Sequence, residues 1–470
     1  MIFNSFEFLW LFPLIFIVYY GITMRKKIAE KWPKIGNFIL LLVSYGLYIK
    51  WKPVFALVLL GITAVTYYAG ILLEKRTDKR KVIVWAGIVL ALIPLILFKY
   101  YNFLSESLEQ ALALAGIQAG LPGLNWAMPL GISYFTLIAI GYVVDVYKQK
   151  NPAEHNWWDY MLFVSFFPAL ASGPISKAAD LLPQIKAHRP FNYAQAVQGC
   201  KWLLWGMFLK VVVADELGLR VDLVYQSYCN YNGFTLFLTS IFYTFQMYCD
   251  FGGYSFMAVG VGQILGFNLV NNFNRPFLAQ NVTEFWHRWH ISLSQWLRDY
   301  VYIPMGGSRC SKFRNYWNIF VTFFICGIWH GANWTYIFWG SLNGIFQIVE
   351  KLFGVNKLKS HGTLRVFRIF LTFMLFSFSM IFFRMSTFQD AFHVIGRIFS
   401  MHNLTTDAWT YWTMLIAIVM FKDIVDETEC KPLQFLHHRF TIVRWATYIV
   451  LLFTIAIMGS FGGQFIYARF

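Results

Sequence analysis

The sequence predicts an all-α, polytopic integral membrane protein, and three observations support that prediction. Of its 470 residues, 58% are hydrophobic and 20% are aromatic. Only 13% are charged, whereas a soluble domain is usually about a quarter charged. The apolar residues gather in repeated long runs, which is typical of helices that cross a bilayer. We expect a helical bundle with about 11 to 13 membrane helices.

Each membrane helix needs about 20 consecutive apolar residues, and some of the runs in this chain are shorter. The runs that we predict as spans are 6–23, 36–50, 54–73, 83–100, 128–147, 202–214, 233–249, 253–268, 315–335, 336–353, 364–383, 410–421 and 441–459. Residues 1–5 lack the basic segment and the small-residue cleavage site of a signal peptide. The first run is therefore expected to remain as a spanning helix.

Basic residues between the runs predict the orientation of the chain, because cytoplasmic loops carry an excess of lysine and arginine. The basic segments 25–27 and 75–81 follow the first and third runs. Placing both in the cytoplasm puts the N-terminus outside and a loop with Glu106 and Glu109 on the outer side. The same distribution accounts for the formal charge of +16, so we expect no nucleic-acid partner.

Two segments differ from simple spans. Residues 160–174 are apolar, but basic stretches flank them on both sides and they contain Pro168 and Pro174. A broken, re-entrant segment fits them better than a full crossing. Residues 271–314 form the longest polar interruption and are expected on the cytoplasmic side. Because no repeat or linker divides the chain, residues 1–470 are predicted to form a single domain.

Two histidines in apolar, aromatic surroundings, His290 and His330, are the candidate catalytic residues. His290 belongs to the polar interruption near the cytoplasmic face, and His330 to the following apolar run at membrane depth. Imidazole is the side chain best suited to move protons near neutral pH, and an ionisable group at membrane depth is a candidate functional group. The alternatives are a core histidine satisfied by its neighbours for His330 and an interfacial histidine for His290.

Other chemistries find less support in the sequence. His287 and His290 have a spacing that suits metal ligands, but no acidic or thiol cluster accompanies them, so no metal is expected. Asp145 and Asp250 lie at the ends of apolar runs and are predicted to be structural, Asp250 as the partner of an arginine; a proton relay is the alternative. The six cysteines show no paired spacing. The sequence contains neither a nucleophile elbow nor a Walker loop.

Two motifs stand out around these histidines. They are Arg288-Trp289-His290-Ile291-Ser292-Leu293-Ser294, continued by Trp296-Leu297-Arg298-Asp299-Tyr300, and Ile328-Trp329-His330-Gly331. Together with stretches at 129–135, 166–168, 172–175, 248–255 and 381–384, they resemble the membrane-bound O-acyltransferase (MBOAT) family. The resemblance spans nearly the whole chain and is greatest to the bacterial branch that includes the membrane subunit of alginate O-acetylation.

The resemblance implies an MBOAT-type helical bundle with re-entrant segments and a cytoplasmic funnel. Its core motif region would cover 129–340, and additional C-terminal helices would follow at 364–470. The resemblance also implies His330 as the catalytic histidine and His290 as the second signature residue. Arg288, Arg298 and Arg309 become candidates for contact with the acyl donor, with architecture or membrane topology as the alternative.

The activity that the resemblance implies is O-acyl transfer, in particular O-acetyl transfer. A cytoplasmic thioester, acetyl-CoA or an acyl carrier protein, would supply the acyl group to hydroxyls of an exported polysaccharide, and no permanently bound cofactor is expected. A periplasmic SGNH-type acyltransferase would be a partner, and the bacterial inner membrane the location. The rival functions are a teichoic-acid type D-alanyl transferase that uses a carrier protein and, from another class, a transporter or channel.

Overall fold

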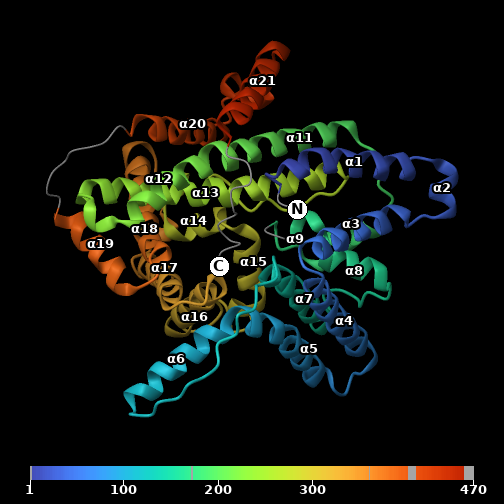
Figure 1. Ribbon diagram of the computed structural model, residues 1–470, viewed down its shortest axis with the longest axis horizontal. Coiled ribbons are helices and arrows are strands. Elements are labelled where there is room, and N and C mark those ends of the chain that lie inside the picture. The colour runs from blue at the N-terminus through green and yellow to red at the C-terminus, as the bar shows by residue number, and fades with distance from the viewer. Residues whose placement is uncertain (1–2, 171–172, 359, 401–408, 460–470) are drawn as a thin grey trace. The chain divides into compact units, whose positions relative to one another are not determined.

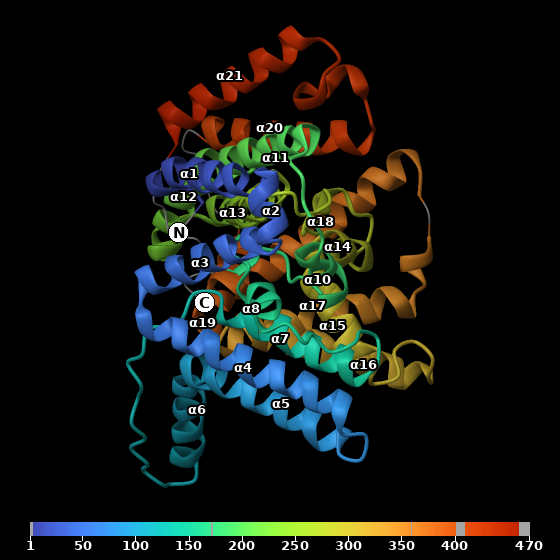
Figure 2. The ribbon, with the colours of Figure 1, turned by 90° about the vertical axis from the view of Figure 1, so that its right-hand side faces the viewer.

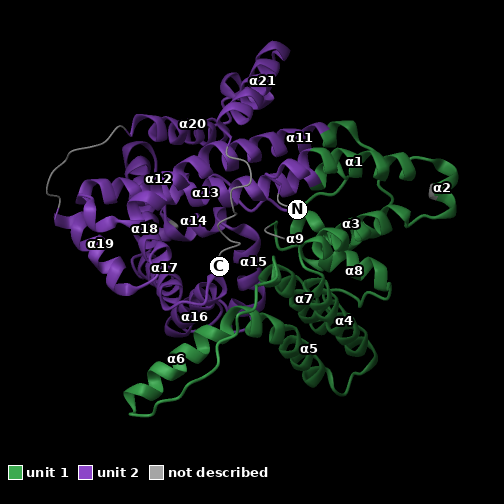
Figure 3. Cartoon of the chain, viewed as in Figure 1, with its two compact units in different colours: residues 1, 10–196, 262–269 green, residues 2–9, 197–261, 270–470 purple. Residues whose placement is uncertain are grey.

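The computed structural model describes residues 3–170, 173–358, 360–400 and 409–459, and the regular structure within these ranges is helical (Figure 1). The predicted all-α class is confirmed. The helices divide between two compact units, each made from separated stretches of the chain (Figure 3). Ser172, in one of the stretches that resemble the MBOAT family, lies outside the described residues. The single domain over 1–470 stays a prediction.

The first unit comprises residues 1, 10–196 and 262–269. Its helices are α1 (Phe6–Thr23, from Trp10 on), α2 (Lys26–Lys31), α3 (Ile35–Trp51), α4 (Pro53–Lys75), α5 (Arg80–Leu95), the π-helix η1 (Ile96–Tyr100), α6 (Tyr101–Leu114), α7 (Ile132–Tyr147), α8 (Trp157–Ser165), α9 (Phe167–Leu170), α10 (Ala178–Lys186) and the start of α11 (Tyr193–Met207). Helices α4, α5 and α7 pack against one another and lie side by side in Figure 2. A Cβ atom on Gly87 of α5 would lie 3.0 Å from the Cβ of Ala69 of α4. Small residues thus bring these helices close together, as is common between membrane helices.

Two local predictions in this unit have different outcomes. The apolar run 160–174 is broken as expected: α8 ends at Ser165, Phe166 leaves the helical conformation, and the short α9 follows. The loop predicted to carry Glu106 and Glu109 is wrong, because both residues lie on α6. Helix α6 continues the apolar α5 through η1, and its sequence contains no glycine or proline that would end a helix.

Five helices in the described residues are long and apolar enough to cross a membrane. They are Phe6–Thr23, Pro53–Lys75, the continuous Arg80–Leu114, Gly362–Arg384 and Thr441–Met458. Two shorter apolar helices, Ile35–Trp51 and Ile132–Tyr147, coincide with further predicted spans. The polytopic membrane class is therefore confirmed, while the number of about 11 to 13 membrane helices stays a prediction.

The second unit comprises residues 2–9, 197–261 and 270–470. Its elements are the start of α1, the rest of α11, the π-helix η2 (Phe208–Ala214), α12 (Asp215–Gln226), η3 (Tyr228–Asn230), α13 (Gly233–Ile264, as far as Val261), η4 (Pro276–Leu278), α14 (Val282–Arg288), α15 (Ile291–Leu297), the π-helix η5 (Arg298–Tyr302), α16 (Lys312–His330), α17 (Trp334–Leu352), η6 (Val355–Lys357), α18 (Gly362–Arg384), α19 (Phe388–Ser400), α20 (Thr410–Glu427), η7 (Lys431–Leu433), η8 (Phe435–His437) and α21 (Thr441–Met458).

Helix α13 corrects the prediction of two spans at 233–249 and 253–268, because it runs unbroken for 32 residues. Asp250 does not end the helix, since its carboxylate accepts a hydrogen bond of 2.5 Å from the buried Lys210. The same lysine lies 2.7 Å from Asp215. The partner of Asp250 that the structure shows is a lysine, whereas an arginine was predicted, and the pairing supports the structural role, because a buried charge is retained when it is paired.

Helices α16 and α17 form a tightly packed hairpin that holds the second candidate histidine (Figure 1). The two backbones meet at glycines: a Cβ atom on Gly340 would lie 2.7 Å from the amide nitrogen of Gly327. At the turn, the side chain of Asn333 caps α17 by accepting a hydrogen bond of 3.0 Å from the amide of Thr335. This hairpin places His330 at the last position of α16.

Candidate active site

His290 lies between α14 and α15 in an unusual backbone conformation. Its φ of 43° and ψ of 53° are left-handed, which costs a non-glycine residue roughly 1 kcal/mol. Buried Asn272 holds the next turn in place: its carbonyl oxygen accepts a hydrogen bond of 3.0 Å from the amide of Ile291, and its Oδ1 accepts one of 3.1 Å from the amide of Ser292. The surrounding chain thus fixes His290 at a strained position, as is common at functional sites.

The His290 side chain is fully buried among aromatic rings. Its ring centroid lies 4.6 Å from that of Phe251 and 5.5 Å from that of Trp329. The residue lies outside the candidate spans. Burial lowers the pKa of His290 to about 3, because the charged form would lose its hydration. The imidazole is therefore neutral at physiological pH.

His330 is also buried, with 1% of its surface exposed. Its ring centroid lies 4.9 Å from that of Trp339 and 5.4 Å from that of Phe383. The ring centroids of His290 and His330 are 6.5 Å apart. We call the four residues around the two histidines, Phe251, Trp329, Trp339 and Phe383, the aromatic enclosure. The structure therefore brings the two predicted histidines together and buries both.

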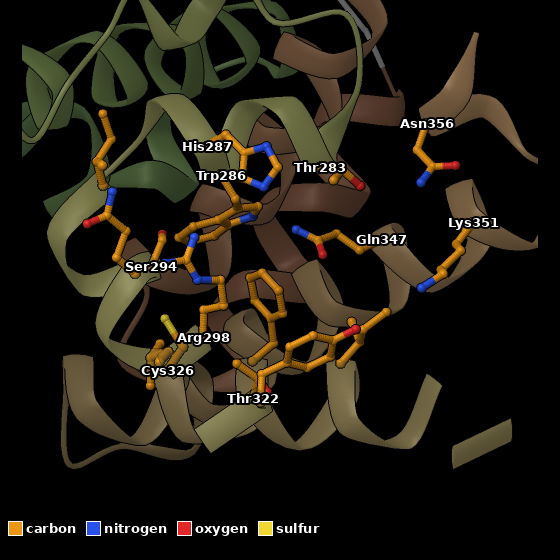
Figure 4. Close-up of a pocket in the computed structure, with 16 residues that line it drawn as sticks. Thr283, Trp286, His287, Ser294, Arg298, Thr322, Cys326, Gln347, Lys351 and Asn356 are labelled. Carbon is orange, nitrogen blue, oxygen red and sulfur yellow. The ribbon is translucent and has the colours of Figure 1, made fainter. Parts of the chain in front are cut away.

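A cavity of about 540 Å³ lies next to this enclosure in the second unit (Figure 4). Its lining comes from α14 to α17 with η5 and η6, namely Thr283, Trp286, His287, Ile291, Ser294, Gln295, Leu297, Arg298, Tyr302, Ile319, Thr322, Phe323, Cys326, Gln347, Lys351 and Asn356. Trp286 connects it to the enclosure, because its ring centroid lies 5.8 Å from that of Trp339. Ile291 and Cys326, which also line it, are one residue after His290 and one helical turn before His330.

The three arginines predicted to contact a donor lie in different places. Only Arg298 among them lines the cavity; its side chain is 56% exposed and lies 2.8 Å from Asp299. Arg309 is exposed and does not belong to the lining. On the far side of the cavity from Arg298, Lys351 and Asn356 are directed toward the same space (Figure 4).

Arg288 belongs instead to a group of ionised side chains that we call the ion-pair cluster: Arg275, Glu284, Arg288, Arg365 and Glu427. The guanidinium of Arg288 donates two hydrogen bonds to Glu427, of 3.0 and 2.9 Å, and lies 2.8 Å from Glu284. Bidentate pairing of this kind uses the guanidinium fully. Its architectural alternative is therefore favoured over contact with a donor.

The sequence analysis did not identify the polar side chains that α17 contributes to the cavity. Gln347 and Lys351 are four residues apart and so share one face of this helix. Two polar residues at this spacing near the end of an otherwise apolar run were a usable signal. Asn272 gave no comparable signal, because its role depends on the strained backbone at His290.

The surroundings of Asp145 and of the cysteines can also be described, and the structural role of Asp145 stays a prediction. Asp145 is buried and lies 3.8 Å from the ammonium group of Lys150. All six cysteines are free thiols. In the part of the chain that the structure describes, no group of three or more His, Cys, Asp or Glu side chains is arranged to hold a metal ion.

Comparison with known proteins shows which family and which proteins this chain resembles. Residues 6–388 match the family model of MBOAT, the membrane-bound O-acyltransferase family. A probable alginate O-acetylase AlgI of Pseudomonas aeruginosa is 37% identical over 405 residues, which cover 85% of this chain and 75% of that protein. A peptidoglycan O-acetyltransferase of Helicobacter pylori is 30% identical over 84% of this chain and 79% of its own length. A teichoic acid D-alanyltransferase of Bacillus subtilis is 27% identical over 64% of this chain and 76% of its own length.

The family match covers more than half of the chain and includes both histidine motifs. The match also favours an acyltransferase over the transporter or channel that the sequence left open, because the matched family consists of acyltransferases. The chain belongs to the membrane-bound O-acyltransferase family and is a membrane-embedded O-acyltransferase.

Proposed function

We propose that this enzyme is an O-acetyltransferase that moves an acetyl group from a cytoplasmic thioester toward hydroxyl groups of an exported polysaccharide. The observation that carries the proposal is the pair of buried histidines, 6.5 Å apart between ring centroids, beside a cavity of about 540 Å³. Similar proteins named as alginate and peptidoglycan O-acetylating enzymes support the acyl group and the class of acceptor. We place the enzyme in a bacterial inner membrane with its N-terminus outside.

In this mechanism His330 is the general base. It takes the proton of the acceptor hydroxyl while the hydroxyl oxygen attacks the thioester carbonyl. The carbon–sulfur bond then breaks, and the imidazolium returns the proton to the departing thiolate. The neutral His290 orients the donor or stabilises charge that develops on the carbonyl oxygen. Because the aromatic enclosure buries both rings, it limits hydrolysis of the thioester by water.

The cavity supports the binding of an extended thioester donor. Its volume lies within the range of small-molecule sites, and apolar residues such as Trp286 and Phe323 line it together with two cations, Arg298 and Lys351. These cations suit the phosphates of coenzyme A or of a carrier protein's phosphopantetheine. The donor is a substrate in either case, and no resident cofactor is needed.

The proposed acceptor implies further transfer on the outer side of the membrane. An SGNH-type acyltransferase would receive the acetyl group there and pass it to the polysaccharide. The D-alanyl alternative has weaker support, because the teichoic acid D-alanyltransferases are less similar and match less of this chain. Acetyl-CoA and a D-alanyl carrier protein, tested as donors with the same purified enzyme, distinguish the two activities.

The histidine base is tested by replacing His330 with alanine. Transfer from [¹⁴C]acetyl-CoA should fall by a factor of about 10² to 10⁴, which is the usual contribution of a general acid–base group. The matched control is His393→Ala, which removes an exposed histidine on α19 and should keep wild-type activity. Wild-type rates in His330→Ala, with normal expression and elution in detergent, would contradict the assignment.

A further inference from the structure

A second cavity, of about 360 Å³, lies in the second unit and shares no lining residue with the first. Its lining comes from α11, from the end of α20 and from the segment 429–437: Gln198, Lys201, Trp202, Trp205, Lys422, Asp426, Glu429, Lys431, Gln434, Leu436 and His437. The family match ends at residue 388, so the wall made by 422–437 lies outside the matched region. The proposed acyl transfer does not use these residues.

The lining carries three lysines against two carboxylates, and its charges are unequally paired. Lys422 forms an ion pair with Asp426 and lies 5.1 Å from the ring centroid of Trp205. The ammonium group of Lys201 lies 3.2 Å from Nδ1 of His437. Within the described ranges, neither Lys201 nor Lys431 forms an ion pair with a carboxylate. Two lysine charges are therefore available to an anionic ligand.

His437 lies among the positive charges of this cavity. Burial lowers its pKa, and the neighbouring cations Lys201 and Lys422 lower it further. A positive charge on the imidazole ring would be repelled by these two ammonium groups, which is why they lower the pKa of His437. A bound anion is the simplest way to offset the accumulated positive charge.

The cavity lies where an apolar helix meets a basic loop. The loop precedes α21, a candidate membrane span of which only 11% is buried within the structure. The hydroxyl of Tyr448 on α21 donates a hydrogen bond of 3.0 Å to the carbonyl of Leu436 in the cavity wall. Apolar side chains of α21 are widely exposed, including Trp445 at 61% and Phe453 at 63%. The base of such a helix is the depth at which lipid headgroups lie.

We propose that this cavity binds the phosphate headgroup of an anionic phospholipid. Lys201 and Lys431 contact the phosphate, the indole rings of Trp202 and Trp205 lie at headgroup level, and the acyl chains run along the exposed apolar surface of α21. A phospholipid satisfies both the positive charge and the adjacent apolar surface, whereas a soluble phosphate satisfies only the charge. Basic residues at the membrane surface each contribute to the binding of anionic lipids.

Native mass spectrometry of the full-length protein in detergent tests this proposal. Phosphatidylglycerol, phosphatidylcholine and coenzyme A are titrated separately against wild type and the double variant Lys201→Gln/Lys431→Gln. Wild type should bind one phosphatidylglycerol in preference to phosphatidylcholine. The double variant should bind phosphatidylglycerol about 25-fold more weakly, since a lysine at the membrane surface contributes about fivefold.

The matched control is Lys26→Gln/Lys27→Gln, which removes two exposed lysines from α2 and changes the net charge equally. It should retain the wild-type affinity for phosphatidylglycerol. Equal weakening in both double variants, or no preference for phosphatidylglycerol in wild type, overturns the proposal. Displacement of phosphatidylglycerol by coenzyme A also overturns it, because the cavity would then be a donor site. Acyl transfer is not the readout, so the proposed function stands or falls separately.

Discussion

Arg288 and His290 are two residues apart, yet they belong to opposite chemical environments. Arg288 lies in the ion-pair cluster, where two carboxylates contact its guanidinium within 3.0 Å. His290 lies in the aromatic enclosure, where its nearest ring neighbours are Phe251 and Trp329. The strained backbone at His290 directs successive side chains of one motif into different surroundings.

The difference shows how this site keeps the imidazole of His290 neutral. Burial favours the neutral form of an imidazole, whereas a carboxylate beside the ring would favour the protonated form. The carboxylate Glu427 is instead held by arginines in the ion-pair cluster. One motif therefore contributes a residue to the ion-pair cluster and places another within the aromatic enclosure, and substitutions in the two regions should have different effects.

The largest effect is expected from Gly340→Ala, which disrupts the packing that supports the aromatic enclosure. The added methyl group would lie 2.7 Å from the amide nitrogen of Gly327 and 2.8 Å from its Cα. Because these are backbone atoms, a side-chain rotation cannot relieve the clash. We expect a loss of about 3 kcal/mol in stability, at the upper end of the usual cost of overpacking, and loss of acyl transfer. Thermal unfolding in detergent and acetyl transfer are the measurements.

Gly396→Ala is the matched control, because Gly396 lies on α19 with open space around its Cα. Replacing an exposed helical glycine by alanine should stabilise the protein by up to about 1 kcal/mol. If Gly340→Ala unfolded at the same temperature as Gly396→Ala, the close packing of α16 against α17 would be contradicted.

A smaller effect is expected in the ion-pair cluster, where Arg288→Met should lower stability by about 2 kcal/mol. The substitution leaves Glu427 partly buried, although Arg275 and Arg365 still compensate some of its charge. The activity of the folded fraction should remain. Unfolding temperature and specific activity, measured on the same preparation, separate the two quantities.

Arg298→Gln sharpens the comparison with Arg288→Met. The Arg298 side chain of its ion pair with Asp299 is 56% exposed, so stability should change by less than about 0.5 kcal/mol. If Arg298 contacts the donor as proposed, the KM for acetyl-CoA should rise about tenfold, as for the loss of a hydrogen bond to a charged group. An unchanged KM would remove Arg298 from the donor site.

Much of the fold could be predicted because membrane helices depend on local composition. The two ends of an apolar run and the breaks at prolines are visible in the sequence, and the broken segment at 160–174 was predicted on that basis. The sequence does not show where a charged residue inside an apolar run is paired with a distant residue, so that the helix continues through it. The two spans predicted at 233–249 and 253–268 are one helix, because Lys210 neutralises Asp250 from another part of the chain.

The site was predicted unevenly for a similar reason. His290 and His330 could be singled out by residue type and surroundings, and the structure places their rings 6.5 Å apart. The three arginines could not be ranked from the sequence, because each has the same local character. Only the fold shows that Arg288 pairs with the distant Glu427 while Arg298 lines a cavity.

The smallest effect is a difference in the pH ranges over which the two regions lose stability. The folded pKa of His290 is lowered to about 3, so below about pH 6.5 the unfolded chain takes up a proton that folded His290 does not. Stability should therefore fall as the pH decreases from 7 to 5.5, by about 1 kcal/mol from this residue. Hydrogen bonds from Arg288 hold the pKa of Glu427 below its ordinary value, so its contribution is lost only as the pH falls below about 4.5.

Thermal unfolding is measured at pH 7, 6.25 and 5.5. The effects of His290 and Glu427 are distinguished by how steeply the unfolding temperature changes with pH. His290→Gln should make the unfolding temperature less dependent on pH in this range, although His437, whose pKa is also lowered, keeps part of the dependence. Glu427→Gln should leave the slope unchanged while lowering the unfolding temperature at every pH. An unchanged slope in His290→Gln would mean that His290 is not held neutral, and the contrast between the aromatic enclosure and the ion-pair cluster would lose its electrostatic basis.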